Sequence, residues 1–265
     1  MTAQWDTVTI VGVGLIGGSA GLALAKRGAA KKIIGVGRSD SSLAAAKEIG
    51  AISEGTTNIR EGVADADFVL VATRVSVIGN QLEEIDTCVR PGTPITDAGS
   101  TKQSIVDRWE QSRSSRKGRF VGSHPLAGSH KRGPQAADPA LFEDKLTVLT
   151  PVESTPKSDT ESISAFWQLI GAQVCHLSPS EHDQLLASAS HAPHIVAAAL
   201  AAATPREAHC FTAGGWRDTT RIAAGDPDLW ADILLDNAKA VTAEIENFTE
   251  VSDQLRHAIE EGDRS

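Results

Sequence analysis

The stretch that decides the fold is Val8-Thr9-Ile10-Val11-Gly12-Val13-Gly14-Leu15-Ile16-Gly17-Gly18-Ser19. A short apolar run rich in β-branched residues ends at its first glycine, and leucines then follow at about helical spacing, so the glycines fall where a strand turns into a helix. In a Gly-x-Gly-x-x-Gly string at such a turn, Gly12 permits the tight turn, Gly14 lets the backbone approach a pyrophosphate, and Gly17 lets the helix pack close to the strand. The stretch therefore predicts a dinucleotide site, and the alternative is a glycine-rich turn in an ordinary α/β domain.

The first helical residues after this turn complete the predicted cofactor site. Free backbone N–H groups and the positive end of the helix would face the phosphates there. We therefore expect five residues to bind the cofactor: Gly12, Gly14, Leu15, Ile16 and Gly17.

The end of the second predicted strand, at residues 32–37, indicates which cofactor is used. A carboxylate about 20 residues after the last motif glycine would bind the ribose hydroxyls of NAD, but Gly37, Arg38 and Ser39 stand there instead. A guanidinium and a hydroxyl suit a 2′-phosphate, so the sequence favours NADP over NAD. The alternative is that Arg38 stacks on the adenine while Ser39 or Asp40 only caps the helix predicted at 41–49.

Strands and helices alternate from residue 50 onward, which predicts a doubly wound parallel sheet covered on both faces. Thr73 follows a strongly apolar strand, at the carboxyl edge where such sheets bind ligands, and we assign it to the cofactor site. The remaining strands are expected at 51–52, 67–72, 94–97, 119–122, 146–150 and 173–177, with a surface connection over 152–160.

Two polar residues at this same edge are candidates for the chemistry. Ser100 follows the strand 94–97 and either caps the next helix or points its hydroxyl into a cleft. His124 stands before Pro125 at the end of the strand that begins at Arg119, which is where a general base would be placed, and the ordinary pKa of an imidazole lies near neutral pH.

Composition narrows the possible partners. The 265 residues include 25 Lys and Arg against 34 Asp and Glu, and the formal charge of −9 argues against a nucleic acid or a membrane surface as partner. Three cysteines without metal-ligand spacing predict reduced thiols and no metal site. The N-terminus lacks a basic and apolar leader, and no uncharged apolar run reaches about 18 residues, so we expect a cytoplasmic protein.

A second, helical domain is predicted after residue 177, which gives domains of 1–177 and 178–265. Its first long helix carries His191 and His194 on either side of Pro193, which should kink the helix. The histidines either line the cleft or form a hydrogen-bonded core pair. The apolar run 195–203 is expected to be a buried helix. From Asp226 a seven-residue apolar repeat predicts one helix of about 30 residues, too long for this domain to cover, and hence a homodimer.

Before the last helix, Asp218 and Arg221 are three residues apart on a predicted helical turn. They would share a face, so that the carboxylate can hold the guanidinium in place to bind a substrate carboxylate. An ordinary surface ion pair is the alternative, which is less favoured because Trp230 and several glycines lie close in the sequence.

Four blocks in this order resemble the prephenate/arogenate dehydrogenase family of tyrosine biosynthesis. They are residues 12–19, Asp97-Ala98-Gly99-Ser100-Thr101-Lys102, Ser123-His124-Pro125-Leu126-Ala127-Gly128, and Arg217-Asp218-Thr219-Thr220-Arg221-Ile222-Ala223 with Asp226-Pro227-Asp228-Leu229-Trp230. The likeness spans nearly the whole chain. It implies a Rossmann domain followed by an all-α dimerisation domain, with the active site in the cleft between them.

The resemblance also implies roles. The substrate would be prephenate or arogenate, with His124 as the base, Ser100 bound to that histidine or to the substrate hydroxyl, and Arg221 on a carboxylate. Asp218, His191, His194 and Trp230 would complete the pocket. One departure is Arg74-Val75, where family members often carry a proline.

Other functions compete with this interpretation. A β-hydroxyacid dehydrogenase also joins a Rossmann domain to a helical one, but it relies on a lysine in the helical domain, where this chain has only Lys239. A nucleotide-binding sensor without turnover is the non-enzymatic alternative, and the set of Ser100, His124 and Arg221 weighs against it.

Overall fold

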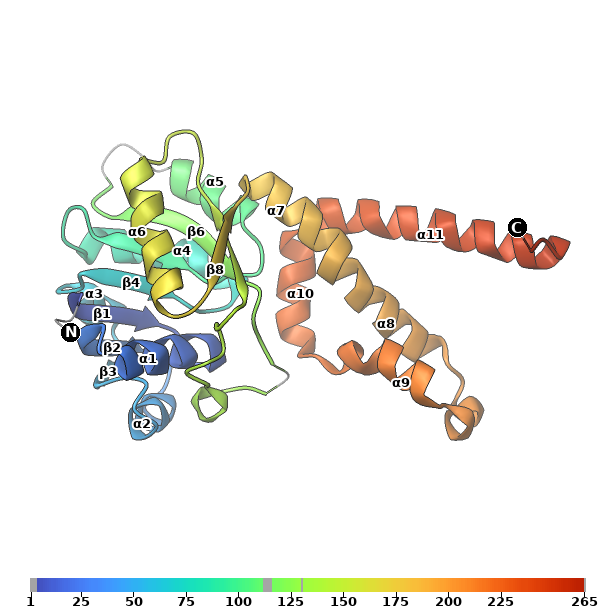
Figure 1. Cartoon of the computed structure of the whole chain (residues 1–265), viewed down its shortest axis with the longest axis horizontal. Helices are drawn as coiled ribbons and strands as arrows, with labels where there is room; N and C mark the ends of the chain where they lie inside the picture. The colour runs from blue at the N-terminus through green and yellow to red at the C-terminus, as the bar shows by residue number, and fades with distance from the viewer. Residues whose placement is uncertain (1–3, 112–115, 130, 265) are drawn as a thin grey trace. The chain divides into compact units, whose positions relative to one another are not determined.

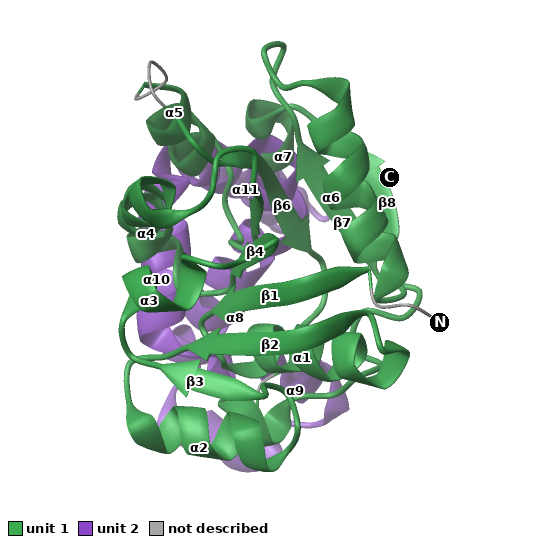
Figure 2. Cartoon of the chain, turned by 90° about the vertical axis from the view of Figure 1, so that its left-hand side faces the viewer, with its two compact units in different colours: residues 1–182 green, residues 183–265 purple. Residues whose placement is uncertain are grey.

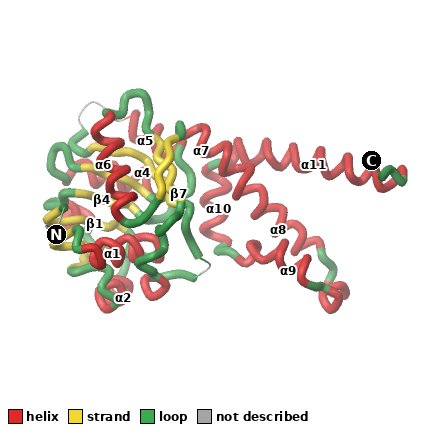
Figure 3. The backbone as a smooth tube through the Cα atoms, in the orientation of Figure 1, coloured by secondary structure: helices red, strands yellow, loops and turns green. Residues whose placement is uncertain are grey.

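The computed structural model describes residues 4–111, 116–129 and 131–264. By its internal contacts the chain divides into two compact units, residues 1–182 and 183–265 (Figure 2). All strands of the described residues lie in the first unit, and the chain after residue 176 is helical (Figure 3). The expected order of an α/β part followed by an all-α part is confirmed.

The first unit is built on one eight-stranded sheet with the order β3-β2-β1-β4-β5-β6-β7-β8 (Figure 1). The first six strands are parallel, whereas β7 runs antiparallel to β6 and β8 runs parallel to β7. The order 3-2-1-4-5-6 is that of a dinucleotide-binding fold, with its switch point between β1 and β4. The strands are β1 Trp5–Val11, β2 Ala30–Val36, β3 Glu54–Thr56, β4 Phe68–Val71, β5 Pro94–Asp97, β6 Arg119–Pro125, β7 Leu146–Thr150 and β8 Gln173–His176.

Helices cover both faces of this sheet because its central strands are apolar on both sides. On one face the main core joins Phe68 of β4 to Leu24 and Phe166 of the covering helices, and the Phe68 and Phe166 rings stack at 4.3 Å. On the other face, Thr9 of β1 donates a hydrogen bond to the Gly62 carbonyl. The helices are α1 Leu15–Arg27, α2 Asp40–Glu48, α3 Ile59–Val63, α4 Val75–Cys88, α5 Gln103–Gln111 and α6 Lys157–Leu169, with a short 3₁₀ turn η2 Pro134–Ala136.

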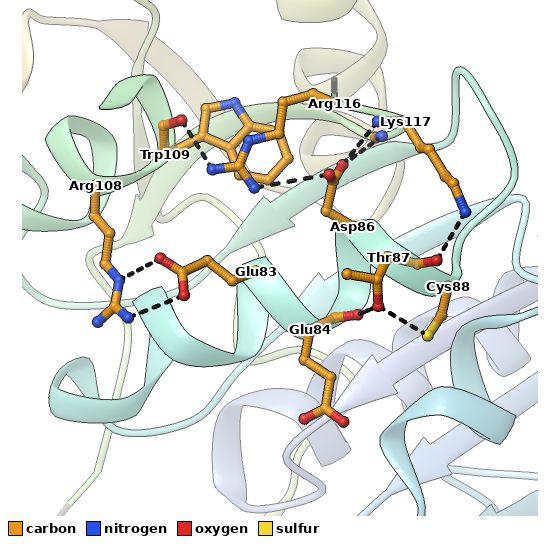
Figure 4. Close-up of polar contacts among 10 residues, drawn as sticks. Glu83, Glu84, Asp86, Thr87, Cys88, Arg108, Trp109, Arg116 and Lys117 are labelled. Carbon is orange, nitrogen blue, oxygen red and sulfur yellow. Dashed lines mark hydrogen bonds and ion pairs between the residues drawn. The ribbon is translucent and has the colours of Figure 1, made fainter. Parts of the chain in front are cut away.

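The segment that enters β6 is tied to the end of α4 (Figure 4). The Asp86 carboxylate accepts hydrogen bonds from the backbone N–H groups of Lys117 at 3.0 Å and Gly118 at 2.8 Å. The Arg116 guanidinium lies 3.9 Å from the centre of the Trp109 ring and donates to the carbonyl of that residue. These contacts fix the start of the strand that carries His124.

Two local predictions in the first unit are wrong. The strand expected at 51–52 lies at Glu54–Thr56, because residues 51–52 form a buried turn in which the Ala51 carbonyl packs against Gly21 of α1. The surface connection expected over 152–160 already contains the start of α6 at Lys157.

Within residues 183–264 the second unit contains helices joined by short turns, and no strand. A capping box opens α7, since the Ser178 hydroxyl accepts from the Glu181 N–H and the Glu181 carboxylate accepts from the Ser178 N–H. Before Pro193 the helix contains a π-helical turn, where we expected a kink. The elements are α7 Pro179–Leu186, which crosses the unit boundary, the π turn η3 Ala187–His191, α8 Ala192–Ala203, η4 Arg206–Phe211, α9 Gly214–Thr220, η5 Arg221–Ala224, α10 Pro227–Asp236 and α11 Ala238–Glu261.

The apolar run at 195–203 is less buried than predicted. Within it only Ala197 is buried, and Leu200 is exposed. Among the described residues, the segment Pro179–Ala203 is long and apolar enough to cross a membrane, with a mean hydropathy of 1.4 over 18 residues. This is weak evidence by length and composition alone, because core helices of soluble proteins meet the same criterion.

The single helix of about 30 residues predicted from Asp226 is also wrong, because Asn237 interrupts it. Asp226 caps α10 as predicted, by accepting from the Asp228 N–H. Asn237 is buried, and its side-chain amide donates to the Asp183 carbonyl at 2.7 Å, which separates α10 from α11. The predicted apolar stripe then continues along α11, where Phe248, Leu255 and Ile259 are exposed in the single chain.

Candidate active site

The glycine turn joins β1 to α1 and depends on two close backbone contacts. Gly12 has a φ of +96°, and a Cβ atom on it would lie 2.5 Å from the Ala72 carbonyl oxygen at the end of β4. A Cβ atom on Gly17 would lie 1.9 Å from the Gly12 carbonyl oxygen. Side chains at these positions are therefore excluded by packing, as the sequence predicts for the first and last glycine of the motif.

Gly14 differs, because a Cβ atom on it would meet no atom within 4 Å. It directly precedes α1, whose first residues, Leu15 and Ile16, have N–H groups without helical acceptors. The turn lies at the switch point of the sheet, between β1 and β4. Open space in front of a helix N-terminus fits the pyrophosphate of a dinucleotide.

Thr73 lies at the same turn, after β4. Its methyl carbon would be 2.8 Å from a Cβ atom on Gly12, and its hydroxyl donates to the Gln81 side-chain oxygen at 2.5 Å. The fold therefore places Thr73 beside the glycine turn, although the elements from α1 to β4 separate the two in the sequence.

The end of β2 carries Arg38 and Ser39, both exposed. Ser39 caps α2 by accepting from the Ser42 N–H at 3.3 Å, so the capping alternative is correct for this hydroxyl. No hydrogen bond or ion pair within residues 4–111, 116–129 and 131–264 involves the Arg38 guanidinium.

Ser100 and His124 come from neighbouring parallel strands, at the same edge of the sheet. Ser100 follows β5, and His124 belongs to β6, which continues to Pro125 instead of ending at Gly122 as predicted. Helix α5 begins only at Gln103, so Ser100 does not cap it. The capping role is therefore wrong, and Ser100 lies in the turn that leaves the sheet edge.

His124 is half-buried, and its ring is held by a second histidine. Its Nδ1 atom lies 2.9 Å from the Nε2 atom of His182, with the two rings edge to face. His182 is fully buried. We did not predict this residue, because it lies 58 positions away on α7 and only the folded chain brings it to the strand.

In the second unit, His191, His194 and Trp230 form one cluster with Gly225 and Asn237. His194 stacks on Trp230 at 3.6 Å, and a Cβ atom on Gly225 would collide with Trp230 at 2.6 Å. His191 is 6.2 Å from the Trp230 ring, and its Nδ1 atom is 3.2 Å from the Asn237 amide. Burial lowers the pKa of His194, whose Nδ1 atom has no hydrogen-bond partner among the described residues.

Arg221 follows α9 and is exposed, as is Asp218. No hydrogen bond or ion pair joins the two side chains in the described part of the chain, so the carboxylate does not hold the guanidinium as we expected. Arg221 begins a 3₁₀ turn, which changes the helical spacing on which that expectation depended. His124 belongs to the first unit and Arg221 to the second, and their meeting around one substrate stays a prediction.

Two family models match consecutive parts of the chain. The nucleotide-binding domain of prephenate dehydrogenase matches residues 20–176, and the dimerization domain of prephenate dehydrogenase matches residues 178–265. The chain belongs to the prephenate dehydrogenase family. As a member of this family it is an oxidoreductase with a nucleotide-binding domain and a dimerisation domain. The resemblance found in the sequence is thereby confirmed.

Individual members of the prephenate dehydrogenase family match along the whole chain. Prephenate dehydrogenase of Bacillus subtilis is 39% identical over 270 residues, which cover 99% of this chain and 72% of that protein. The crystal structure of Aquifex aeolicus prephenate dehydrogenase with hydroxyphenyl propionate and NAD+ has a TM-score of 0.88 at 33% identity, covering 97% of this chain and 91% of that one. Synechocystis arogenate dehydrogenase has a TM-score of 0.83 at 29% identity, covering 97% and 93%.

Proposed function

We propose that this protein catalyses the oxidative decarboxylation of prephenate to 4-hydroxyphenylpyruvate in tyrosine biosynthesis, with NAD(P) as hydride acceptor. The observation that carries the proposal is the position of His124 in a chain of this family. It lies at the carboxyl edge of the sheet, on the side where the glycine turn ends β1, with its ring oriented by His182. Ligands of open α/β sheets bind at this edge.

His124 acts as the general base in this proposal. Since its Nδ1 atom is engaged with His182, its Nε2 atom is the one that accepts the proton of the substrate's C4 hydroxyl. Ser100, on the neighbouring strand end, hydrogen-bonds to the same hydroxyl or to the imidazole. As C4 loses its hydride and becomes a ketone, the ketone oxygen accepts, through the ring, the electron pair left by the departing CO2. The ring becomes aromatic, and the phenolate oxygen takes up a proton.

The cofactor is a nicotinamide dinucleotide held by five residues of the glycine turn and by Thr73. The fit is supported by the open space at Gly14, because any side chain there would occupy the place of the pyrophosphate. When bound, the nicotinamide supplies the acceptor for the hydride. The chain itself then needs only to orient the substrate and accept one proton.

The second unit binds the rest of the substrate in this proposal. Arg221 is an exposed guanidinium and pairs with a substrate carboxylate. The cluster of His191, His194 and Trp230 forms one wall of the substrate pocket in this proposal, and Asp218 is a further substrate-binding residue.

NADP is the proposed cofactor in preference to NAD. The support is the exposed guanidinium of Arg38, without a partner in the described chain, beside Ser39, Ser41 and Ser42 at the N-terminus of α2. A 2′-phosphate would accept hydrogen bonds from both kinds of group.

Arogenate is the second candidate substrate, favoured by the likeness to Synechocystis arogenate dehydrogenase. It differs from prephenate by an amino group in place of the side-chain keto group and would give tyrosine directly. A β-hydroxyacid substrate is not favoured, because both domains match models of the prephenate dehydrogenase family.

We further propose that the active form is a cytoplasmic homodimer joined through the helical domain, without nucleic acid or membrane partners. The support is the exposed apolar stripe of α11 at Phe248, Leu255 and Ile259, together with the match to a dimerization domain. A second copy would cover this stripe. Light scattering after gel filtration tests the proposal, and a monomer at micromolar concentration would contradict it.

One experiment tests the activity itself. The purified chain is assayed spectrophotometrically for NAD(P)H formation with prephenate and with arogenate, each against NAD+ and NADP+. We expect turnover with prephenate and a higher kcat/KM for NADP+ than for NAD+. No turnover in any combination of these substrates and cofactors would overturn the proposed function.

A further inference from the structure

We infer that Asp97, paired with Lys102, is a positioning residue that holds Ser100 and His124 at a fixed separation. The inference rests on the proposed function and concerns a residue at the end of β5, beneath the predicted site. Asp97 and Lys102 are both completely buried.

The Asp97 carboxylate binds three segments at once. Its Oδ1 atom accepts from the Ser123 N–H at 3.0 Å, and its Oδ2 atom accepts from the Gly99 N–H at 2.8 Å. The Lys102 ammonium group donates to the same Oδ2 atom. One side chain thus joins the end of β5, the turn after it, the start of α5 and the adjacent strand β6.

These partners flank the two predicted catalytic residues. Ser100 lies between Gly99 and Lys102, which both bind the carboxylate, and His124 directly follows Ser123. A shift of Asp97 would therefore move the backbone at both residues. Proton transfer requires heavy atoms at about 2.6–3.2 Å, so small backbone shifts at either residue affect turnover.

The Ser123 hydroxyl supplies a second link between the same strands. It donates to the Asp97 carbonyl, and it accepts from the Trp167 indole N–H at 2.9 Å. The Thr96 hydroxyl lies 2.8 Å from it. All four residues are fully buried, so the network is shielded from water.

Lys102 has a different task, which is to compensate the buried charge. A buried carboxylate without a counter-charge is strongly unfavourable, and removing only one partner leaves the other charge unpaired. The ion pair thus stabilises an ionised carboxylate at this buried position, and both of its oxygens accept hydrogen bonds. An amide could not accept from all of these donors. An asparagine has one acceptor oxygen, and its amide group would face a donor on the other side.

The test separates stability from positioning with two variants and a control. Asp97→Asn removes the carboxylate that the Lys102 ammonium group binds, whereas Asp97→Asn with Lys102→Met removes both charges. Ile95→Val, on the same strand and also buried, is the control that alters packing without altering an acceptor. For each we measure the melting temperature, kcat, the KM for prephenate and the Kd for NADP+.

We expect both variants that carry Asp97→Asn to lose at least about 10-fold in kcat, with KM and Kd within about 3-fold of the unmodified protein. The double variant should regain most of the melting temperature lost in Asp97→Asn, but not the lost turnover. The control should keep its kcat. Recovery of kcat together with stability in the double variant would reduce Asp97 to a structural ion pair and overturn the inference.

A second measurement needs no variant. Amide hydrogen exchange of the unmodified protein should show slow exchange at both Gly99 and Ser123, because each N–H is held by the carboxylate. Fast exchange at either amide would contradict the inference even if the variants do not fold. Absence of turnover in the unmodified protein would instead contradict the proposed function, whatever the exchange shows.

Discussion

The Nδ1 atom of His124 lies 2.9 Å from the Nε2 atom of His182, so the orientation of one imidazole is set by another. One of the two nitrogens must carry the hydrogen. If it is Nδ1 of His124, the Nε2 atom of that ring can act as an acceptor, as a general base requires. His182 then accepts from the imidazolium that forms during turnover and steadies it.

Replacing the base tests its role directly. His124→Asn keeps a polar side chain of similar reach but cannot take a proton near neutral pH. We expect kcat to fall at least about 100-fold, while prephenate still binds with nearly unchanged affinity. Initial rates and equilibrium binding measure the two effects, and full turnover in the variant would exclude His124 as the base.

His182 should act through the orientation of His124. His182→Leu removes the acceptor for the Nδ1 hydrogen, and we expect kcat to fall at least about 10-fold with little change in KM. His182→Gln restores an acceptor oxygen and should recover part of the loss. Equal activity of the two variants would show that the hydrogen bond does not matter for catalysis.

Arg221 should contribute mainly to binding. Hydrogen bonds to charged groups contribute about 1.5–3 kcal/mol, so Arg221→Ala should raise the KM for prephenate at least about 10-fold and leave kcat within a few-fold. Arg206→Ala, another exposed arginine of the second unit, is the matched control. A fall in kcat at unchanged KM would instead show that Arg221 stabilises the transition state more than the bound substrate.

The glycine turn allows stability and cofactor binding to be separated. Gly14→Ala meets no protein atom, so the melting temperature should be kept while the Kd for the cofactor rises at least about 10-fold. Gly17→Ala places its methyl group against the Gly12 carbonyl and should lower the free energy of unfolding by about 1–3 kcal/mol. Calorimetry measures the stability of the two variants, and fluorescence titration measures their Kd for the cofactor. Unchanged cofactor affinity in Gly14→Ala would place the pyrophosphate elsewhere.

A structural feature of this chain can be predicted from the sequence when the residues that cause it are close together in the sequence. Gly12 and Gly17 are required by contacts within one strand, turn and helix or with the adjacent strand β4, and their spacing in the sequence already expresses this. The strand that leads to His124 could likewise be located, because an apolar run precedes that residue, although β6 continues to Pro125.

Contacts between distant segments could not be predicted in this way. Asn237 breaks the last helix because its amide reaches Asp183, 54 positions earlier, and no feature of the heptad pattern signals that contact. His182 and Asp97 are similar cases, since burial and partners from other elements give them their roles. Asp97 belongs to the recognised block 97–102. The block alone does not show whether its carboxylate is exposed at the carboxyl edge of the sheet or buried beneath that edge.

The stacked pair of His194 and Trp230 predicts a dependence of stability on pH. Burial lowers the pKa of His194 below its ordinary value of 6.5, so the folded chain holds this imidazole neutral while the unfolded chain takes up a proton. As the pH falls below 6.5, the unfolded state therefore binds more protons and the folded state loses stability, until the pH passes the lowered pKa of the folded form. Melting temperatures between about pH 7.5 and 5 should fall less steeply in His194→Gln than in the unmodified protein, whereas substitution of the exposed His209 by Gln serves as the control. An unchanged slope in His194→Gln would mean that the acid sensitivity comes from other groups.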